Sequence, residues 1–380
     1  MIRVAINGYG RIGRVAHRVI LEKYSSEIDV VAINAGSSSD INGWMYLLKY
    51  DSVYGPLNRS INVIPDLIRD PDSGQARMTK EMLNQVQHDK EQDSIGSFVI
   101  DDKKIPVFSQ KDASLLPWRD LNVDVVLECT GLMRAEEKLK VHITAGAKKV
   151  VLSAPAKPAR NASASVAGGD DGIGTYVLSV NGQDYKGENI ISNASCTTNC
   201  IAPVAKVMMD NFGIEKAMMT TVHGYTSDQR LQDGGHKDYR RARAAALNIV
   251  PTSTGATQAA SKALPELSNK FSGLALRVPV PVGSLSDFTF LLKKDTTVEE
   301  INNAFKKAAE ESQYKNILEV TEDPLVSSDI IGNPHSAIVD LSLTQVVGGN
   351  MAKVVAWYDN EYGYANRLVE EVLMVGKNSS

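Results

Sequence analysis

The chain has 380 residues, a formal net charge of −4 and a hydrophobic content of 43%. Two domains are expected at this length, because a single hydrophobic core rarely organises so many residues. The weakly acidic charge argues against nucleic acid as a principal partner, and no apolar run approaches the roughly 20 residues that cross a bilayer. An odd number of cysteines and an N-terminus without the pattern of a secretory signal predict a cytoplasmic protein.

Strands alternate with helices in the first part of the chain. Ile2 to Asn7 predicts a strand, Gly8 to Gly13 a tight turn and Arg14 to Lys23 a helix. Further strands are predicted at Asp29 to Asn34, Val123 to Cys129 and Lys149 to Ser153. This alternation is typical of a Rossmann-type, doubly wound parallel sheet.

The stretch from about 64 to 94 interrupts this alternation. It is polar and carries Pro65, Pro71 and Gly74 before a helix-like run from Thr79 to Lys90. Because so short an isolated helix would be marginal in water, we interpret the stretch as an insertion, a surface excursion between two strands.

Beyond Asn193 the pattern changes to long β-rich segments. A helix from about Thr197 to Asn211 comes first, and an amphipathic helix from Val298 to Glu311 is opened by Thr297. The other predicted elements are strands at Ala217 to Gly224, Ala275 to Pro281, Asp287 to Lys293 and Lys353 to Tyr358, and a closing helix from Gly363 to Gly376. We predict an α+β domain with a mostly antiparallel sheet over residues 196–359, and a first domain over 1–195 to which 360–380 returns.

A glycine motif follows the first strand. Gly8, Gly10 and Gly13 match G-x-G-x-x-G, which is a weak signal by itself because glycine-rich turns are common. Its place between the first strand and the first helix strengthens it, since there the glycines let a pyrophosphate approach the helix N-terminus. We favour a dinucleotide-binding turn over a plain strand-to-helix turn.

The second strand lacks the acid that such sites usually carry. About 20 residues after the glycines, a carboxylate normally accepts a hydrogen bond from the adenosine ribose 2′-hydroxyl. Here the strand ends Ile33-Asn34-Ala35. Without a carboxylate at Ala35 there is no like charge to repel a 2′-phosphate, so NADP is admissible as well as NAD.

A cysteine precedes the first helix of the second half. Cys196 lies in the run Ser192 to Cys200, where backbone N–H groups and the helix dipole favour a thiolate. We therefore predict that Cys196 is a nucleophile with a lowered pKa. Cys200, one turn later, is expected to be a small buried hydrophobe, and the C-x-x-x-C spacing predicts no metal site.

The candidate base for this thiol is His223, at the end of the strand-like run Met218 to Val222. A neutral imidazole can accept the thiol proton and pass it on to the substrate. A single histidine on a strand is more often structural, and a Cys/His pair also occurs in thiol hydrolases. A hydrolase, however, leaves the glycine turn unexplained.

Four motifs together resemble the phosphorylating glyceraldehyde-3-phosphate dehydrogenase family. They are Ile6 to Arg14, Ser192 to Cys200, Thr220 to His223 and Trp357 to Glu361. The resemblance covers nearly the whole chain apart from the insertion and a looser stretch near 158–175. It implies that residues 1–195 form the dinucleotide-binding domain and 196–359 the catalytic domain.

The resemblance implies that Cys196 forms a thiohemiacetal with an aldehyde and that His223 is its base. Hydride would pass to the nicotinamide, and inorganic phosphate would release the thioester as 1,3-bisphosphoglycerate in a reversible step of glycolysis or gluconeogenesis. A phosphorylated aldehyde and free phosphate need two anion sites built from hydroxyls, N–H groups and guanidinium groups. The implied substrate and phosphate residues are Ser195, Thr197, Thr226, Arg241, Thr254, Gly255 and Arg277, with Arg241 chosen over Arg240 and Arg243.

The cofactor-binding residues that the resemblance implies are Gly8, Gly10, Arg11, Ile12, Gly13, Ala35, Thr130, Ser153 and Asn360. Ala35 replaces the acid of NAD-specific members, and Gly234-Gly235 replaces a Leu-Pro pair that lines their adenosine ribose. Both departures favour NADP with NAD tolerated. The resemblance also implies a homotetramer. The alternatives are erythrose-4-phosphate dehydrogenase and, from another class, a non-catalytic nucleotide- or RNA-binding scaffold.

Overall fold

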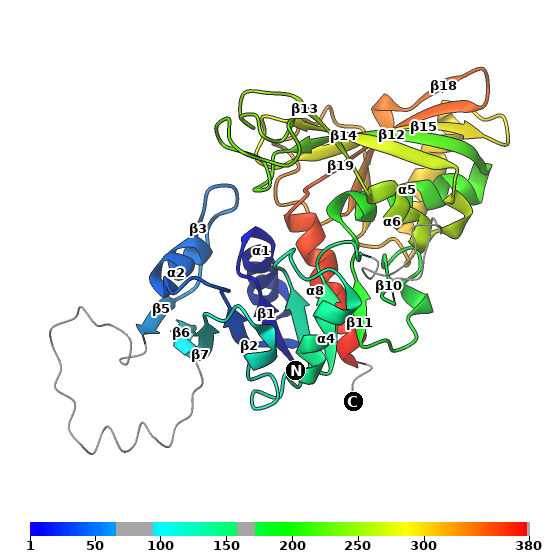
Figure 1. The fold of residues 1–380 in the computed structure, drawn as a ribbon. Helices are drawn as coiled ribbons and strands as arrows, with labels where there is room; N and C mark the ends of the chain where they lie inside the picture. Colours follow the sequence, from blue (N-terminus) through cyan, green and yellow to red (C-terminus); the bar gives the residue numbers. More distant parts are fainter. Residues whose placement is uncertain (66–93, 158–171, 378–380) are drawn as a thin grey trace, which may run out of the picture. The chain divides into compact units, whose positions relative to one another are not determined.

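The computed structural model describes residues 1–65, 94–157 and 172–377. The chain divides into two compact units, drawn in Figure 1. Unit 1 comprises residues 1–133, 137–150 and 375–380, and unit 2 comprises residues 134–136 and 151–374. The domain boundary expected at residue 195 was placed from sequence motifs, whereas the two units are defined by their compactness. The boundary at residue 195 therefore stays a prediction.

A largely parallel sheet forms the centre of unit 1. Its strands are β1 (Ile2–Asn7), β2 (Ile28–Asn34), β5 (Ile61–Pro65), β6 (Ser94–Ile100), β7 (Lys103–Phe108), β8 (Val125–Glu128) and β9 (Lys149–Leu152), which leads into unit 2. They lie in the order β9-β8-β1-β2-β7-β6-β5. β1 pairs in parallel with β2 and β8, and β2 pairs in parallel with β7. β6 pairs antiparallel with both neighbours, and the sequence patterns did not predict β5 to β7.

The helices of unit 1 follow its strands. They are α1 (Arg11–Val19), which continues as a turn of π-helix (Ile20–Tyr24), α2 (Ile41–Lys49) and α4 (Glu136–Thr144), with a short hairpin of β3 (Tyr50–Asp51) and β4 (Gly55–Pro56) and a 3₁₀ turn (Ala113–Leu115). The predicted helix from Arg14 therefore begins earlier, at Arg11. Of the predicted insertion, Ile64 and Pro65 belong to β5 and Ser94 to β6, whereas 66–93 lie outside the described residues.

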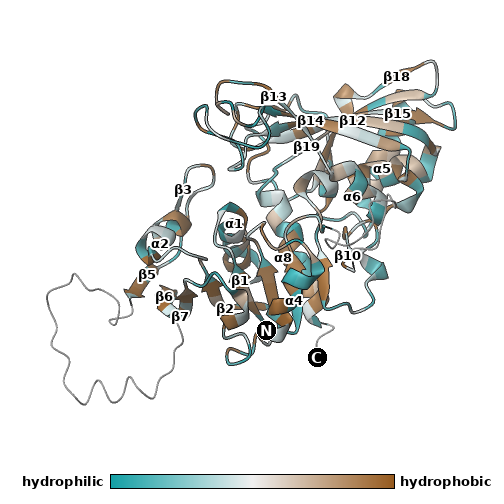
Figure 2. Cartoon of the chain, viewed as in Figure 1, coloured by the Kyte–Doolittle hydropathy of each residue, from teal (hydrophilic) through white to brown (hydrophobic). Residues whose placement is uncertain are grey.

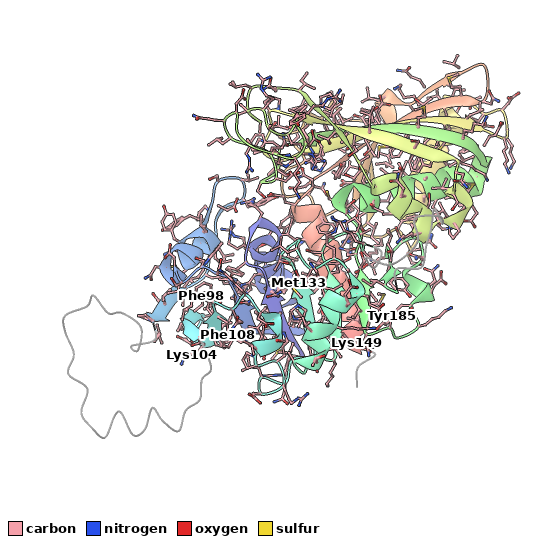
Figure 3. The ribbon with its side chains drawn as sticks, viewed as in Figure 1. Phe98, Lys104, Phe108, Met133, Lys149 and Tyr185 are labelled. Atoms are coloured by element: carbon pink, nitrogen blue, oxygen red, sulfur yellow. The ribbon has the colours of Figure 1, made fainter. Side chains whose placement is uncertain are left out.

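Apolar strands and aromatic rings make up the core of unit 1. Residues of β1 and β2 are buried, and the same strands appear as apolar segments in Figure 2. Phe98 on β6 and Phe108 on β7, labelled in Figure 3, pack against Tyr9 and Trp118 with ring centroids 5.9 Å and 6.5 Å apart. Burial of these rings fixes β6 and β7 beside the parallel strands.

A buried histidine makes the stability of unit 1 pH-dependent. His17 on α1 is 0% exposed, its Nδ1 lies 2.7 Å from the Tyr9 hydroxyl, and its Nε2 has no hydrogen-bond partner among the described residues. Burial lowers the pKa of His17 from 6.5 to about 3, so between these values the unfolded chain binds more protons than the folded protein. The contribution of His17 to the unfolding free energy is therefore complete above pH 6.5 and is lost as the pH falls toward about 3.

We expect His17→Gln to flatten this pH dependence. At pH 5 the wild-type protein should have lost about 2 kcal/mol of unfolding free energy through His17, relative to pH 7.5. Urea unfolding at the two pH values gives the loss of unfolding free energy for each protein. The difference between the two losses is the contribution of His17, because the other groups contribute equally to both proteins. Equal losses in both proteins would contradict the expectation.

A mixed sheet forms unit 2. Its strands are β12 (Ile214–Gly224), β13 (Val250–Ser253), β14 (Phe271–Val278), β15 (Ser284–Leu292), β16 (Leu318–Thr321), β17 (Ala337–Asp340), β18 (Gln345–Val347) and β19 (Met351–Tyr358). The order is β13-β14-β12-β15-β19-β17-β16, with β18 also on β19. Most neighbours are antiparallel, as predicted, but β12 with β14 and β16 with β17 are parallel. β10 (Gly174–Thr175) and β11 (Ile190–Ser192) pair in parallel and belong to the same nine-stranded sheet as β9, in the order β10-β11-β9.

Helices pack on the core side of this sheet. They are α5 (Cys196–Phe212), α6 (Ala256–Ala263) and α7 (Val298–Glu310). The last helix of the chain is α8 (Tyr362–Lys377), and 3₁₀ turns occur at Gly182–Asp184, Pro265–Leu267 and Leu341–Leu343. Phe288 and Phe290, both 0% exposed, stack with ring centroids 5.4 Å apart in the core that α5 and α6 share with the sheet. Thr297 caps α7 through a capping box with Glu300, which confirms the predicted start of that helix. No helix among the described residues has the length and apolar character needed to span a membrane.

Candidate active site

The glycine turn of unit 1 leaves an open cradle at the start of α1. Gly8 has a φ of +95°, and a Cβ at this position would lie 2.6 Å from the Thr130 nitrogen. A Cβ on Gly13 would collide with the Gly8 carbonyl oxygen, whereas one on Gly10 would meet nothing within 4 Å. Gly10 caps α1 without a side-chain hydrogen bond, so the first N–H groups, from Arg11 and Ile12, suit a pyrophosphate.

Arg11 is held by the β3–β4 hairpin. Its Nη1 donates to Asp51 Oδ2 at 2.5 Å, and its guanidinium lies 5.7 Å from the centre of the Tyr54 ring. The side chain is therefore already engaged, which leaves the backbone N–H of Arg11 as the group best suited to the predicted phosphate contact.

The end of β2 carries amides in place of an acid. Ala35 follows Asn34, whose Nδ2 donates to Asn7 Oδ1 at 2.7 Å and whose Oδ1 accepts from the Gln110 nitrogen at 3.0 Å. Ala35 is partly exposed, so a ligand can reach it. The residues of unit 1 thus fit a dinucleotide and place no negative charge at Ala35.

The reactive thiol stands at the head of a long helix in unit 2. Cys196 is the first residue of α5, and Ser195 caps the helix by accepting from the Thr198 nitrogen at 3.1 Å. Ala194 adopts a φ of +51°, and its carbonyl accepts from the Tyr364 hydroxyl of α8 at 3.2 Å. The cap and this hydrogen bond fix the turn that presents the thiol. Cys200 is 0% exposed, as predicted.

His223 faces this thiol. Its Nε2 lies 3.5 Å from Cys196 Sγ, and its Nδ1 lies 2.7 Å from the Gly224 carbonyl oxygen. We place the ring proton on Nδ1, where it is donated to that carbonyl, so that Nε2 is free to accept the thiol proton. The structure thus brings together Cys196 and His223, which the sequence analysis paired although they are far apart in the chain.

Arg277 lies beside His223 because strands β12 and β14 are parallel neighbours in register. The pairing sets His223 opposite Arg277. Arg277 Nη1 lies 3.0 Å from His223 Nδ1 and donates to the Gly224 carbonyl and the Thr226 hydroxyl, each at 3.2 Å. A guanidinium therefore adjoins the pair of Cys196 and His223.

The ionisation of the pair differs from the sequence prediction. Burial raises the pKa of the Cys196 thiol, and Arg277 and Thr197 only partly oppose this effect. Burial, helped by Arg277, lowers the pKa of His223 to about 3. The predicted lowered thiol pKa is therefore wrong, because burial outweighs the helix N-terminus. Both shifts favour a neutral thiol beside a neutral imidazole over an ion pair.

A second cluster extends from Arg277. Thr226 donates to Asp228, which also accepts from Arg241 Nη1 at 2.5 Å. Burial disfavours the charge on Asp228, but Thr226 and the two arginines more than offset it and lower the pKa of Asp228. Of the three candidate arginines only Arg241 joins this cluster, since Arg240 hydrogen-bonds to Asp238 through its backbone and Arg243 pairs with Asp233. No motif in the sequence analysis pointed to Asp228.

Two helix N-termini meet near Ser195. Its hydroxyl lies 2.8 Å from Thr198 Oγ1, which donates to the Ala256 carbonyl at 3.4 Å. Gly255 caps α6 without a side-chain hydrogen bond, and Thr254 Oγ1 accepts from the Ala256 nitrogen at 3.2 Å. Hydroxyls and helix N-termini in this arrangement suit an anion.

The remaining predicted residues of unit 2 have mixed surroundings. Thr197 Oγ1 lies 3.0 Å from the buried Tyr358 hydroxyl, which also contacts Thr221, so Thr197 is tied into the core and Tyr358 was missed from the sequence. Asn360 Oδ1 accepts from the Ser284 hydroxyl at 2.8 Å. Ser153 follows β9 and is partly exposed. The His, Cys, Asp and Glu side chains of residues 1–65, 94–157 and 172–377 form no cluster that would hold a metal.

A nucleotide cradle on a Rossmann-type unit is typical of a dehydrogenase, and a Cys/His pair beside a guanidinium group suits a dehydrogenase whose substrate is bound to a thiol. Two family models match the chain: the NAD-binding domain of glyceraldehyde 3-phosphate dehydrogenase over residues 2–70 and 71–136, and the C-terminal domain of the same enzyme over 195–360. The chain therefore belongs to the glyceraldehyde-3-phosphate dehydrogenase family, which confirms the predicted family, fold class and enzyme class.

Relatives match over the full length of the chain. The glyceraldehyde-3-phosphate dehydrogenases of Mycobacterium avium and Mycolicibacterium smegmatis are each 48% identical to it, and both alignments cover 99% of each partner. The enzyme of Streptomyces coelicolor is 45% identical over 99% of this chain and 98% of its own length. The similarity therefore includes both the nucleotide-binding and the thiol-bearing parts.

Proposed function

We propose that the protein oxidises glyceraldehyde 3-phosphate to 1,3-bisphosphoglycerate through a thioester on Cys196. The observation that carries the proposal is the 3.5 Å approach of Cys196 Sγ to His223 Nε2, with Arg277 beside the imidazole. The sulfur attacks the aldehyde carbon while its proton passes by way of His223 to the carbonyl oxygen, which gives a thiohemiacetal. His223 then takes up the hydroxyl proton as the carbon loses a hydride, which leaves a thioester on Cys196. The nicotinamide, when bound, supplies the hydride acceptor. Phosphate then cleaves the thioester and frees the thiol.

The rate of aldehyde oxidation with and without inorganic phosphate tests this proposal. We expect rapid oxidation of glyceraldehyde 3-phosphate that depends on phosphate. Erythrose 4-phosphate is the comparison substrate, and phosphate-independent turnover of that sugar alone would favour the erythrose-4-phosphate dehydrogenase reaction instead. Absence of turnover on both sugars would favour a non-catalytic nucleotide-binding scaffold.

We assign the two phosphate groups of this reaction to the two clusters of unit 2. One contains Thr226, Arg241 and Arg277 and is supported by the contacts that Asp228 and Arg277 make. The other contains Ser195, Thr254 and Gly255 and is supported by the uncapped N-terminus of α6. Guanidinium groups and helix N-termini both favour phosphate. Asp228 would hold the arginine side chains in place before an anion arrives.

The family match supports NAD binding, and we propose that NADP is also used, and preferred. Two features support this extension: Ala35 leaves the end of β2 without a carboxylate, and a Cβ on Gly235 would meet nothing within 4 Å. Absence of charge and bulk removes two obstacles to a 2′-phosphate. A kcat/KM for NADP at a small fraction of the NAD value would overturn the NADP proposal.

We expect Ala35→Asp to reverse the preference. A carboxylate there can accept from the ribose 2′-hydroxyl and repels a 2′-phosphate, so kcat/KM for NADP should fall about 10- to 100-fold while that for NAD rises or stays constant. Initial rates with each nucleotide give both values. Ala35→Asn is the matched control, since it adds similar volume without charge. Equal effects of both variants would contradict the electrostatic explanation.

We also propose a homotetramer in which the open sheet face of unit 2 contacts a second copy of the chain. Met218 is 67% and Leu274 44% exposed there, beside a shallow hollow lined also by Gly273 and Thr289. Such apolar exposure favours association. Sedimentation should give a mass four times the 41.2 kDa of one chain, and Met218→Asp should shift it toward smaller species. A monomeric wild-type protein would refute the assembly.

We propose a cytoplasmic location, supported by the reduced thiols of Cys196 and Cys200. We also propose that residues 1–195 with 360–380 form the dinucleotide-binding domain and that residues 196–359 form the catalytic domain. The support for this division is the C-terminal family model, which begins at residue 195 and ends at 360.

A further inference from the structure

A fully buried carboxylate ends the strand next to the glycine turn. Glu128, the last residue of β8, is 0% exposed. One of its oxygens accepts from Asn7 Nδ2 at 2.6 Å and lies 3.2 Å from His142 Nε2. The other accepts from the Thr130 nitrogen at 2.8 Å and from the Thr130 hydroxyl. So many donors around one buried carboxyl group need an explanation, because burying a charge is costly unless it is hydrogen-bonded.

The histidine beside Glu128 is neutral. Trp118 Nε1 can only donate, and it lies 3.0 Å from His142 Nδ1, so this ring nitrogen accepts. The ring proton is therefore on Nε2 and is donated to Glu128. A charged imidazolium would set two N–H groups against each other at Trp118. Glu128 is thus held by directed hydrogen bonds rather than by a counter-ion, and its two oxygens serve two different groups.

One oxygen of Glu128 fixes the residue on which the glycine turn rests. Thr130 is bound at both its nitrogen and its hydroxyl, and its hydroxyl also accepts from the Leu132 nitrogen at 3.1 Å. Gly8 packs so closely on Thr130 that a Cβ would lie 2.6 Å from the Thr130 nitrogen. A shift of Thr130 would therefore move the turn that opens α1.

The other oxygen controls the end of β2 through a relay of amides. Asn7, oriented by Glu128, accepts at its Oδ1 from Asn34 Nδ2 at 2.7 Å. Asn34 Oδ1 in turn accepts from the Gly36 nitrogen at 3.3 Å and the Gln110 nitrogen at 3.0 Å. Each amide has its orientation set by the one before it, so the backbone around Ala35 is tied to the same carboxylate.

We propose that Glu128 is a positioning residue for the dinucleotide: it holds the glycine turn and the Ala35 segment in one fixed arrangement. This rests on the proposed function only in that unit 1 binds NAD or NADP. Glu128 touches neither nucleotide half in this proposal. It acts through Thr130 on one side and through Asn7 and Asn34 on the other.

Glu128→Gln tests the proposal because it keeps the size and loses two acceptor sites. Whichever way the new amide turns, its NH₂ faces donors, either those of Thr130 or those of Asn7 and His142. We expect the Kd for the preferred dinucleotide, measured by titration calorimetry without substrate, to rise at least about tenfold. The rate of Cys196 alkylation should stay within about twofold of the wild type, because that thiol belongs to unit 2.

Asp124→Asn is the matched control. Asp124 precedes the same strand at its other end, where it accepts from the Arg3 nitrogen at 2.9 Å and pairs with Lys148. Loss of this carboxylate should lower the melting temperature without raising the Kd. A Kd unchanged in Glu128→Gln, or raised equally in Asp124→Asn, would overturn the positioning role and leave a purely structural one.

Asn7→Ser is the second variant, for use if Glu128→Gln does not fold. It removes one donor from Glu128 and the acceptor of Asn34, and we expect it too to raise the dinucleotide Kd several-fold with alkylation of Cys196 unaffected. An unchanged Kd would refute the relay. A wild-type protein that binds neither NAD nor NADP would refute the nucleotide function itself, which is a distinct result from variants that bind as the wild type does.

Discussion

Replacing Cys196 with serine should lower kcat/KM for glyceraldehyde 3-phosphate by at least about 10⁴-fold. Burial already raises the pKa of the thiol, so the reaction depends on the intrinsic nucleophilicity of sulfur and on proton transfer to His223 at 3.5 Å. A serine hydroxyl is far less acidic than a thiol and its oxygen is a weaker nucleophile, so His223 cannot activate it to the same degree. The variant keeps the shape of the site and loses its chemistry.

Initial rates and dinucleotide affinity together check this expectation. The Kd for the nucleotide should be unchanged in Cys196→Ser, and iodoacetamide should label the wild-type protein at Cys196 but not at Cys200, which is 0% exposed. Cys200→Ala is the control: it should reduce stability through a small cavity and leave kcat within about threefold. Turnover in Cys196→Ser close to the wild-type rate would remove the thiol mechanism altogether.

Much of the fold was predictable because local patterns decide it. The β-branched run Ile2–Asn7, the glycine turn and the apolar face of the next helix need only neighbouring residues, and the structure has them as β1 and α1. The strands β5 to β7 were missed, since β5 and β6 pair across the stretch 66–93 in the sequence. Their partners could not be inferred from spacing. The parallel pairing of β12 with β14 is likewise a long-range choice.

Some residues of the candidate site could also be predicted from the sequence. Motifs identified Cys196 and His223, and the structure brings them together. Asp228 and Glu128 were missed because each acts through hydrogen bonds to residues distant in the sequence or in an unpredicted loop. The thiol pKa was predicted in the wrong direction because the helix N-terminus can be read from sequence, whereas burial cannot. The residues of the candidate site could therefore be chosen from the sequence, whereas the direction of the thiol pKa shift required the tertiary structure.

Replacing His223 with asparagine should lower kcat by about 10²- to 10⁴-fold, the usual contribution of a positioned general base. Asparagine keeps a polar group beside Arg277 but cannot take up the proton of Cys196. His335→Gln is the control. His335 precedes β17 and pairs with Glu319, so its loss should leave kcat unchanged. A fall in kcat of less than about fivefold in His223→Asn would contradict the assignment of the base.

The pH profile of the wild-type protein tests the same assignment without a substitution. The pKa of His223 is lowered to about 3, so the imidazole is already neutral throughout the range in which a histidine normally titrates. kcat/KM, which reports the free enzyme, should therefore show no acid limb near pH 6.5 and should hold its value down to the pH where the fold is lost. At alkaline pH, kcat/KM should rise as the thiol ionises. This rise occurs at alkaline pH because burial raises the pKa of Cys196. An acid limb centred near pH 6.5 that disappears in His223→Asn would mean that the imidazole is hydrated in solution, and that His223 and Cys196 exchange their proton in the resting enzyme instead of during attack.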